Sequence, residues 1–152
     1  MRILVIGYGN PGRLDDGLGP AFAERIQALA IPGVTTDADY QLNIEDAAEL
    51  RHYDAVVFAD ASMDAAEPFT LQPLAPEHTG LGFSSHSVSP AAVLGLADAL
   101  FGARPHAHLL GIRGHAFDGF GEGLSEQAKI NLEAAVKHME PLLKSGEHGF
   151  FK

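Results

Sequence analysis

Residues 2–18 read RILVIGYGNPGRLDDGL, and this stretch decides how the rest of the chain is interpreted. Residues 2–6 form an apolar, β-branched run that predicts a buried strand. The glycine-rich segment after it predicts a turn, and apolar residues then recur at helical spacing over about residues 17–29. A strand, a turn and an amphipathic helix in this order begin a βαβ unit, which is typical of an α/β fold.

The later segments continue the same alternation of strands and helices. We therefore expect one sheet covered by helices on both faces. No repeat or linker divides the chain, so residues 1–152 are predicted to form a single domain, with 145–152 as a mobile tail. The expected strands are 34–36, 55–59, a short or edge strand at 69–71, and 108–112; the expected helices are 43–50, one starting at Ser89-Pro90, and one capped by Ser125.

Composition limits the chemistry and the partners of the chain. The sequence of 152 residues has no cysteine, which excludes thiolate nucleophiles and sulfur-ligated metals. A formal net charge of -10 opposes binding to nucleic acid. No apolar run approaches the ~18 residues of a membrane span, and the run at residues 2–6 is too short for a signal peptide. We expect a cytoplasmic monomer without a membrane or nucleic-acid partner.

The turn at Gly7 to Gly12 matches the G-x-G-x-x-G spacing of dinucleotide-binding proteins. However, Asp15 and Asp16 stand where the phosphates would lie, and carboxylates at a helix N-terminus favour a cation instead. One aspartate is explained as a helix cap, which leaves the other unexplained. The same turn resembles that of peptidyl-tRNA hydrolases, but the Thr-Arg-His-Asn stretch with their catalytic histidine is absent.

Three residues that could bind a metal follow predicted strands or precede a predicted helix. Asp16 follows the first turn, Asp60 ends the central apolar run, and His86 lies before the helix at Pro90. Ligands of open parallel sheets bind beyond the carboxyl ends of the strands, and two carboxylates with one imidazole suit a divalent ion. Taken singly, each residue is better explained as a cap or a solvated side chain. His115 is a further candidate for the pocket, with a solvated loop position as its alternative.

The chain resembles the hydrogenase maturation proteases. The similarity rests on residues 2–10 and 15–19, on Asp60, on Ser85-His86, and on the glycines of 94–96, 111–112 and 121–125. It implies a three-layer sandwich with a twisted, mostly parallel sheet. Three features depart from the family pattern. Asp16 is one methylene shorter than the glutamate of many members, Arg113 stands where relatives often have an uncharged or acidic residue, and the segment 87–90 differs from the better-known branch.

The resemblance also implies a substrate and roles for the candidate residues. The substrate would be the large-subunit precursor of a nickel-iron hydrogenase, from which a C-terminal peptide is removed after nickel insertion. Asp16, Asp60 and His86 would bind nickel that the substrate supplies, or another divalent metal in vitro. Asp15 or Asp16 would accept a proton during cleavage. The alternatives are a non-proteolytic, metal-dependent chaperone of hydrogenase assembly and a Rossmann-like nucleotide-binding domain.

Overall fold

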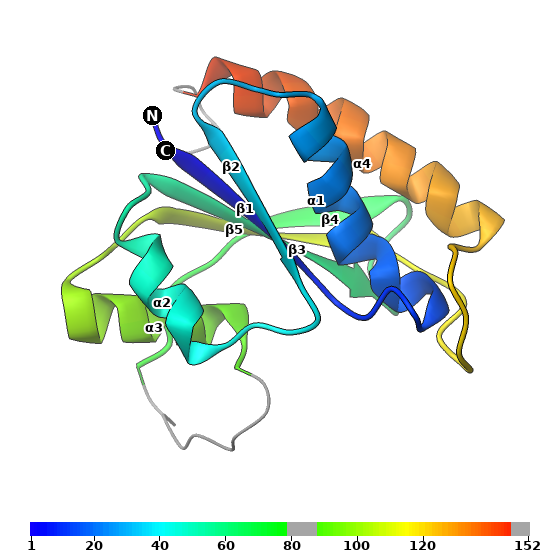
Figure 1. The fold of residues 1–152 in the computed structure, drawn as a ribbon, viewed down its shortest axis with the longest axis horizontal. Coiled ribbons are helices and arrows are strands. Elements are labelled where there is room, and N and C mark those ends of the chain that lie inside the picture. Colours follow the sequence, from blue (N-terminus) through cyan, green and yellow to red (C-terminus); the bar gives the residue numbers. More distant parts are fainter. Residues whose placement is uncertain (79–87, 147–152) are drawn as a thin grey trace.

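The computed structural model describes residues 1–78 and 88–146, which fold into three layers, with one sheet between two layers of helices (Figure 1). The sheet has five strands in the order β2-β1-β3-β5-β4. The strands are β1 (Ile3–Tyr8), β2 (Val34–Asp39), β3 (Ala55–Ser62), β4 (Phe69–Pro73) and β5 (His106–Arg113). The helices are the 3-10 helix η1 (Leu14–Gly17), α1 (Leu18–Ala28), α2 (Ile44–Leu50), α3 (Pro90–Phe101) and α4 (Glu126–Ser145).

Four strands are parallel and one edge strand is antiparallel. β1 pairs with β2 on one side and with β3 on the other, and β3 pairs with β5, all in the parallel sense. β4 adds to β5 in the antiparallel sense and forms one edge of the sheet. The central strands β1 and β3 are buried on both faces, which explains their uninterrupted apolar sequences.

Each face of the sheet has its own apolar core. Helices α1 and α4 cover one face, where Phe22 and Met139 are fully buried. Helices α2 and α3 cover the opposite face, where Leu50 and Phe58 are fully buried (Figure 1). The predicted α/β sandwich, with helices on both faces of a mostly parallel sheet, is confirmed.

The predicted elements are all present, with longer strands and small shifts in the helices. The edge strand β4 and the cap of α2 agree with the sequence patterns, since Asn43 forms a capping box with Asp46. β3 continues beyond the predicted end because its polar residues after Ala59 still pair with β5. In α4, Leu143 is buried more deeply than the predicted Leu142.

The end of the last helix corrects one boundary. The mobile tail was predicted to begin at residue 145, but Ser145 is the last residue of α4 and Gly146 caps it. The rest of the predicted tail, 147–152, lies outside the described residues. In the described part of the chain, we find no helix with the length and apolarity needed to cross a membrane.

Candidate active site

The sheet has a switch point between β1 and β3, where two candidate residues meet. The chain leaves β1 towards β2 at one edge and leaves β3 towards β4 at the other edge. Connections that diverge in this way open a crevice at the carboxyl ends of the strands, the usual place for a ligand in such sheets. Tyr8 ends β1, Asp60 lies near the end of β3, and Asp16 lies in η1 immediately after the first turn.

The glycines of the first turn are needed because the backbone folds onto itself. Gly9 has a φ of 142°, and a Cβ placed there would lie 2.1 Å from the carbonyl oxygen of Asp16. A Cβ on Gly19 would lie 2.3 Å from the carbonyl oxygen of Tyr8. Gly9 thus contacts the chain's own backbone, in the place where a dinucleotide-binding turn would approach a phosphate. This packing holds η1 and Asp16 against the end of β1.

The carboxylates of Asp16 and Asp60 lie near each other, and no cationic side chain of the described residues pairs with either one. The backbone N–H of Asn10 donates a 2.7 Å hydrogen bond to Oδ2 of Asp16 and fixes its orientation. Burial, reinforced by the nearby charge of Asp16, raises the pKa of Asp60 to about 6, although a backbone hydrogen bond from Ala61 opposes the rise. Within the described residues, neither Asp16 nor Asp60 forms a salt bridge. Two oxygen ligands with unbalanced charge suit a divalent cation.

Tyr8 supplies the nearest polar partner of Asp60. Its hydroxyl group donates a hydrogen bond to the Asp60 carboxylate, and burial followed by the charge of Asp60 raises the pKa of Tyr8 above its ordinary value. The phenol therefore remains a neutral donor at physiological pH. One side of the Asp60 carboxylate is held by this donor, at the carboxyl end of β1.

Asp15 differs sharply from its neighbour Asp16, because its carboxylate is buried and saturated with donors. It accepts hydrogen bonds from the backbone N–H groups of His115, Ala116 and Ser125 and from the Ser125 hydroxyl, at 2.7–2.9 Å. Burial alone would raise the pKa of Asp15, but the hydrogen bonds from these three residues outweigh it and hold the pKa below its ordinary value. Asp15 thereby ties the first turn to the loop between β5 and α4.

Comparison with known proteins was made by sequence and by structure. The sequence matches no protein-family model, and no curated protein matches it. The structure, in contrast, closely matches a [NiFe] hydrogenase maturation protease, HycI from Thermococcus kodakarensis. The two share 26% identity with a TM-score of 0.71, over 94% of this chain and 92% of that one. The chain has the fold of the hydrogenase maturation proteases.

Two further solved structures extend this similarity. The hydrogenase 2 maturation peptidase from Thaumarchaeota archaeon SCGC_AB-539-E09 is 26% identical, with a TM-score of 0.68, over 95% of this chain and 99% of that one. The maturating endopeptidase HybD from E. coli is 23% identical, with a TM-score of 0.66, over 96% and 94%. The predicted resemblance to the maturation proteases is thus confirmed, and it supports a hydrolase that cleaves peptide bonds.

The structure brings together two of the three predicted metal ligands. Asp16 and Asp60 lie at the same switch point, whereas His86 falls outside the described residues. Across residues 1–78 and 88–146, no group of three or more His, Asp or Glu side chains could hold a metal ion. The three-ligand site therefore remains a prediction, and the described residues contain only its two carboxylates.

His115 lies in the loop that Asp15 organises. Its backbone N–H donates to Asp15, and its ring contacts the carboxylate of Glu67, which also accepts from Asn131 of α4. The ring is partly exposed. His115 thus links two loops at the carboxyl end of the sheet.

Tyr8 is the site residue that sequence reasoning missed. The signal was available, because Tyr8 follows the apolar run of β1 directly and carries a polar tip at the carboxyl end of that strand. The glycines on either side drew attention to the turn instead. In this maturation-protease fold, Tyr8 completes the described part of the site with Asp16 and Asp60.

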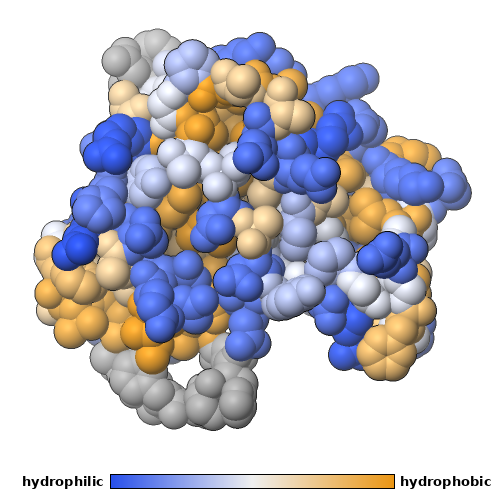
Figure 2. Space-filling view, in the orientation of Figure 1, coloured by the Kyte–Doolittle hydropathy of each residue, from blue (hydrophilic) through white to orange (hydrophobic). Residues whose placement is uncertain are grey.

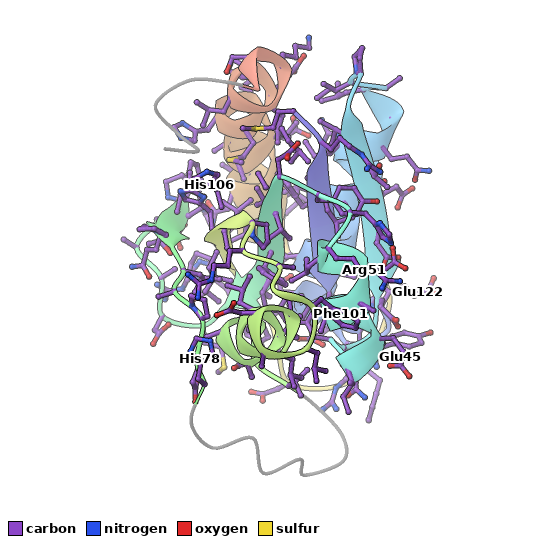
Figure 3. All side chains as sticks on the ribbon, turned by 90° about the vertical axis from the view of Figure 1, so that its left-hand side faces the viewer. Glu45, Arg51, His78, Phe101, His106 and Glu122 are labelled. Carbon is purple, nitrogen blue, oxygen red and sulfur yellow. The ribbon has the colours of Figure 1, made fainter. Side chains whose placement is uncertain are left out.

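A cavity lies at the opposite, amino ends of the strands. It has a volume of about 520 Å³ and is lined by Arg51, Arg104 and His106 among others. Figure 3 shows that Arg51 and His106 face the same side of the molecule. However, Arg51 stacks on Phe101 and Arg104 pairs with Asp98, so both guanidinium groups already have partners. The carboxyl ends of β1 and β3, with Asp16 and Asp60, are therefore the stronger candidate for chemistry.

Proposed function

We propose that this chain is a cytoplasmic endopeptidase that removes a C-terminal peptide from the nickel-loaded large-subunit precursor of a nickel-iron hydrogenase. The observation that carries the proposal is the pair of carboxylates, Asp16 and Asp60, which form no salt bridge with any described residue and lie at the switch point of a maturation-protease fold. Such a pair attracts a divalent cation because binding offsets the cost of a buried negative charge on Asp60 and the smaller repulsion from Asp16, which together raise the pKa of Asp60. His86 is proposed as the third ligand.

The proposed metal belongs to the substrate and serves as the signal for cleavage. Two or three ligands with open coordination positions bind a free ion weakly, yet they complete the coordination of an ion that a partner already holds. Cleavage then depends on metal loading. Other divalent ions would bind to the same carboxylates in vitro.

Asp16 is the better candidate for a proton acceptor during cleavage. Asp15 already accepts four hydrogen bonds, so little of its lone-pair capacity remains for a reacting water. Asp16 accepts the Asn10 backbone hydrogen bond through Oδ2 and is partly exposed. In the proposed step, a water attacks the scissile carbonyl and passes a proton to Asp16, which delivers it to the leaving amine.

The test is an intact-mass time course of the co-encoded large-subunit precursor, with and without nickel loading. We expect the wild type to remove a C-terminal peptide from the loaded precursor only. Asp16→Ala, Asp60→Asn and His86→Ala should each slow cleavage by at least about 100-fold. His52→Ala is the matched control, since His52 is an exposed histidine outside the site.

Two outcomes would contradict the proposal. Cleavage of the nickel-free precursor at the same rate would exclude recognition of the metal. An unchanged mass for a loaded precursor that still forms a nickel-dependent complex with the protein would identify a chaperone of hydrogenase assembly instead.

A further inference from the structure

The outer edge of β2 has backbone N–H and C=O groups that form no hydrogen bond with any described residue. In the pairing with β1, Ile3 donates to the carbonyl of Gly33 and Gly9 donates to the carbonyl of Asp39. The N–H and C=O of one strand residue point to the same side, and the side alternates along the strand. Thr36 and Ala38 therefore direct their backbone groups away from the sheet, at an edge that could pair with another strand.

A groove runs along this edge between β2 and α1. One cavity, of about 420 Å³, is lined by Thr36 and Ala38 of β2 and by Pro20, Glu24 and other residues of α1. A second cavity, of about 220 Å³, shares Pro20 and Ala38 with the first. The two cavities thus form one track, which we name the edge groove. Figure 1 shows β2 and α1 side by side on the near side of the molecule.

The edge groove ends at the turn that carries the candidate active site. Its second cavity is lined by Gly9 and Pro11 of that turn. Gly9 packs against the carbonyl of Asp16, and the next residue, Asn10, orients the Asp16 carboxylate. A chain that lies in the groove is therefore led towards the proposed catalytic group.

The charge and the shape of the edge groove indicate what it would hold. Glu24, Asp37 and Asp39 line it, and none of them forms a salt bridge within the described residues. Tyr40, 69% exposed, adds an aromatic surface at the end nearest the site. Acidic walls beside an open strand edge favour an extended segment with basic side chains at alternate positions.

We propose that the edge groove binds an extended, basic peptide segment of the substrate as an additional strand on β2. That the segment comes from a protease substrate rests on the proposed function. Backbone pairing with Thr36 and Ala38 provides affinity for any extended chain, and Glu24 selects a lysine or arginine. The groove then sets the direction in which the substrate enters the site.

The test uses a capped synthetic peptide of about ten residues, alternating valine and lysine, which matches the length of a strand and does not depend on hydrogenase. We expect the peptide to bind, with the largest NMR changes at the amides of Thr36 and Ala38. Methylation of alternate backbone nitrogens of the peptide blocks either the N–H groups that face β2 or those that face away from it. The first set of methyl groups should weaken binding at least about tenfold, and the second set should weaken it little.

Protein variants separate the groove from general attraction to an acidic protein. Ala38→Pro removes an outward N–H at an edge position that tolerates proline, and Glu24→Lys reverses the charge of the wall. Each should weaken binding of the peptide at least about tenfold. Glu126→Lys is the matched control, because Glu126 is an exposed glutamate on α4 that does not line the edge groove. The Glu126→Lys protein should bind the peptide as the wild type does.

The outcomes distinguish failure of the groove from failure of the proposed function. Equal binding of a valine–glutamate peptide, or equal weakening by Glu126→Lys and Glu24→Lys, would overturn the edge groove. With a cleavable precursor, Ala38→Pro and Glu24→Lys should raise KM about tenfold and leave kcat unchanged. If the peptide binds at β2 but the wild type cleaves no precursor, the groove stands and the proposed function fails.

Discussion

The hydroxyl of Tyr8 donates a hydrogen bond to the carboxylate of Asp60, and this contact joins the ends of the two central strands. It places a neutral donor beside a carboxylate that also lies near the charge of Asp16. Asp60 is thus held in a fixed orientation although burial and Asp16 both disfavour its ionised form.

Asp60→Asn should stabilise the metal-free protein at pH 8. The pKa of Asp60 in the folded protein, about 6, lies above its ordinary value of 3.8. The contribution of protonated Asp60 to the free energy of unfolding is therefore complete below pH 3.8 and is lost as the pH rises through about 6. The amide cannot ionise, and the gain at pH 8 should be about 2 kcal/mol, allowing for solvent screening of a half-buried group. Urea unfolding at pH 4 and pH 8 measures it.

The control for this prediction is Asp64→Asn, which alters an exposed carboxyl group in the loop after β3. It should leave stability within about 0.5 kcal/mol at both pH values. An Asp60→Asn effect of equal size at pH 4 and pH 8 would show that ionisation of Asp60 is not its cause.

Tyr8→Phe should raise the pKa of Asp60 further. Burial sets the upward shift, and the hydrogen bond from Tyr8 opposes it by favouring the ionised carboxylate. The expected rise is on the order of 1 pKa unit for the loss of one hydrogen bond to a charged group. Carbon-13 NMR titration of the Asp60 side chain would measure it. Tyr53→Phe, a change beside Arg2, should leave the titration of Asp60 as it is in the wild type.

Asp15→Asn should destabilise the protein far more than Asp16→Asn. The amide of asparagine has one acceptor oxygen, so buried N–H groups of His115, Ala116 or Ser125 lose their partner, at about 1–3 kcal/mol each. The stabilisation from Asp15 is present at neutral pH and is lost as the pH falls below 3.8, because its folded-state pKa is lowered.

Urea unfolding and cleavage together distinguish the roles of the two aspartates. Asp16→Asn should retain most of its stability and lose activity, whereas Asp15→Asn should lose both in parallel. A stable but inactive Asp15→Asn protein would instead assign the proton-acceptor role to Asp15.

Gly9→Ala should disrupt the site turn, whereas Gly119→Ala should not. Both glycines have positive φ angles, 142° and 104°, so both substitutions introduce backbone strain. Only Gly9 faces a backbone atom, since nothing lies within 4 Å of a Cβ at Gly119. We expect Gly9→Ala to cost about 2–4 kcal/mol and Gly119→Ala about 1 kcal/mol, measured by thermal unfolding. Equal losses would mean that η1 moves away from Gly9 without cost.

The sequence predicted the fold and the position of the candidate residues at the carboxyl edge of the sheet well because both depend on local patterns. Uninterrupted apolar runs identified β1 and β3, and the residues after such runs necessarily lie at the carboxyl edge of a parallel sheet. Asp16 and Asp60 were placed correctly by this rule. The end of β3 was not, because Asp60 and Ser62 interrupt the apolar pattern while their backbones continue to pair with β5.

The role of Asp15 could not be derived from the sequence, because its partners lie about a hundred residues further along the chain. Two adjacent aspartates after a turn look equivalent until the loop between β5 and α4 is placed. Likewise, the open side of β2 follows from which strand pairs with β1, which is a property of the whole sheet.

The long-range contacts of Asp15 also determine when the site can form during synthesis. The ribosome releases the first turn long before Ser125 and α4 exist, so the Asp15 carboxylate has none of its four donors in the nascent chain. β5, which separates β3 from β4 in the sheet, is also made late. The N-terminal half alone therefore carries Asp15 without the contacts that fix it, and a growing chain completes this part of its site only when Ser125 has emerged.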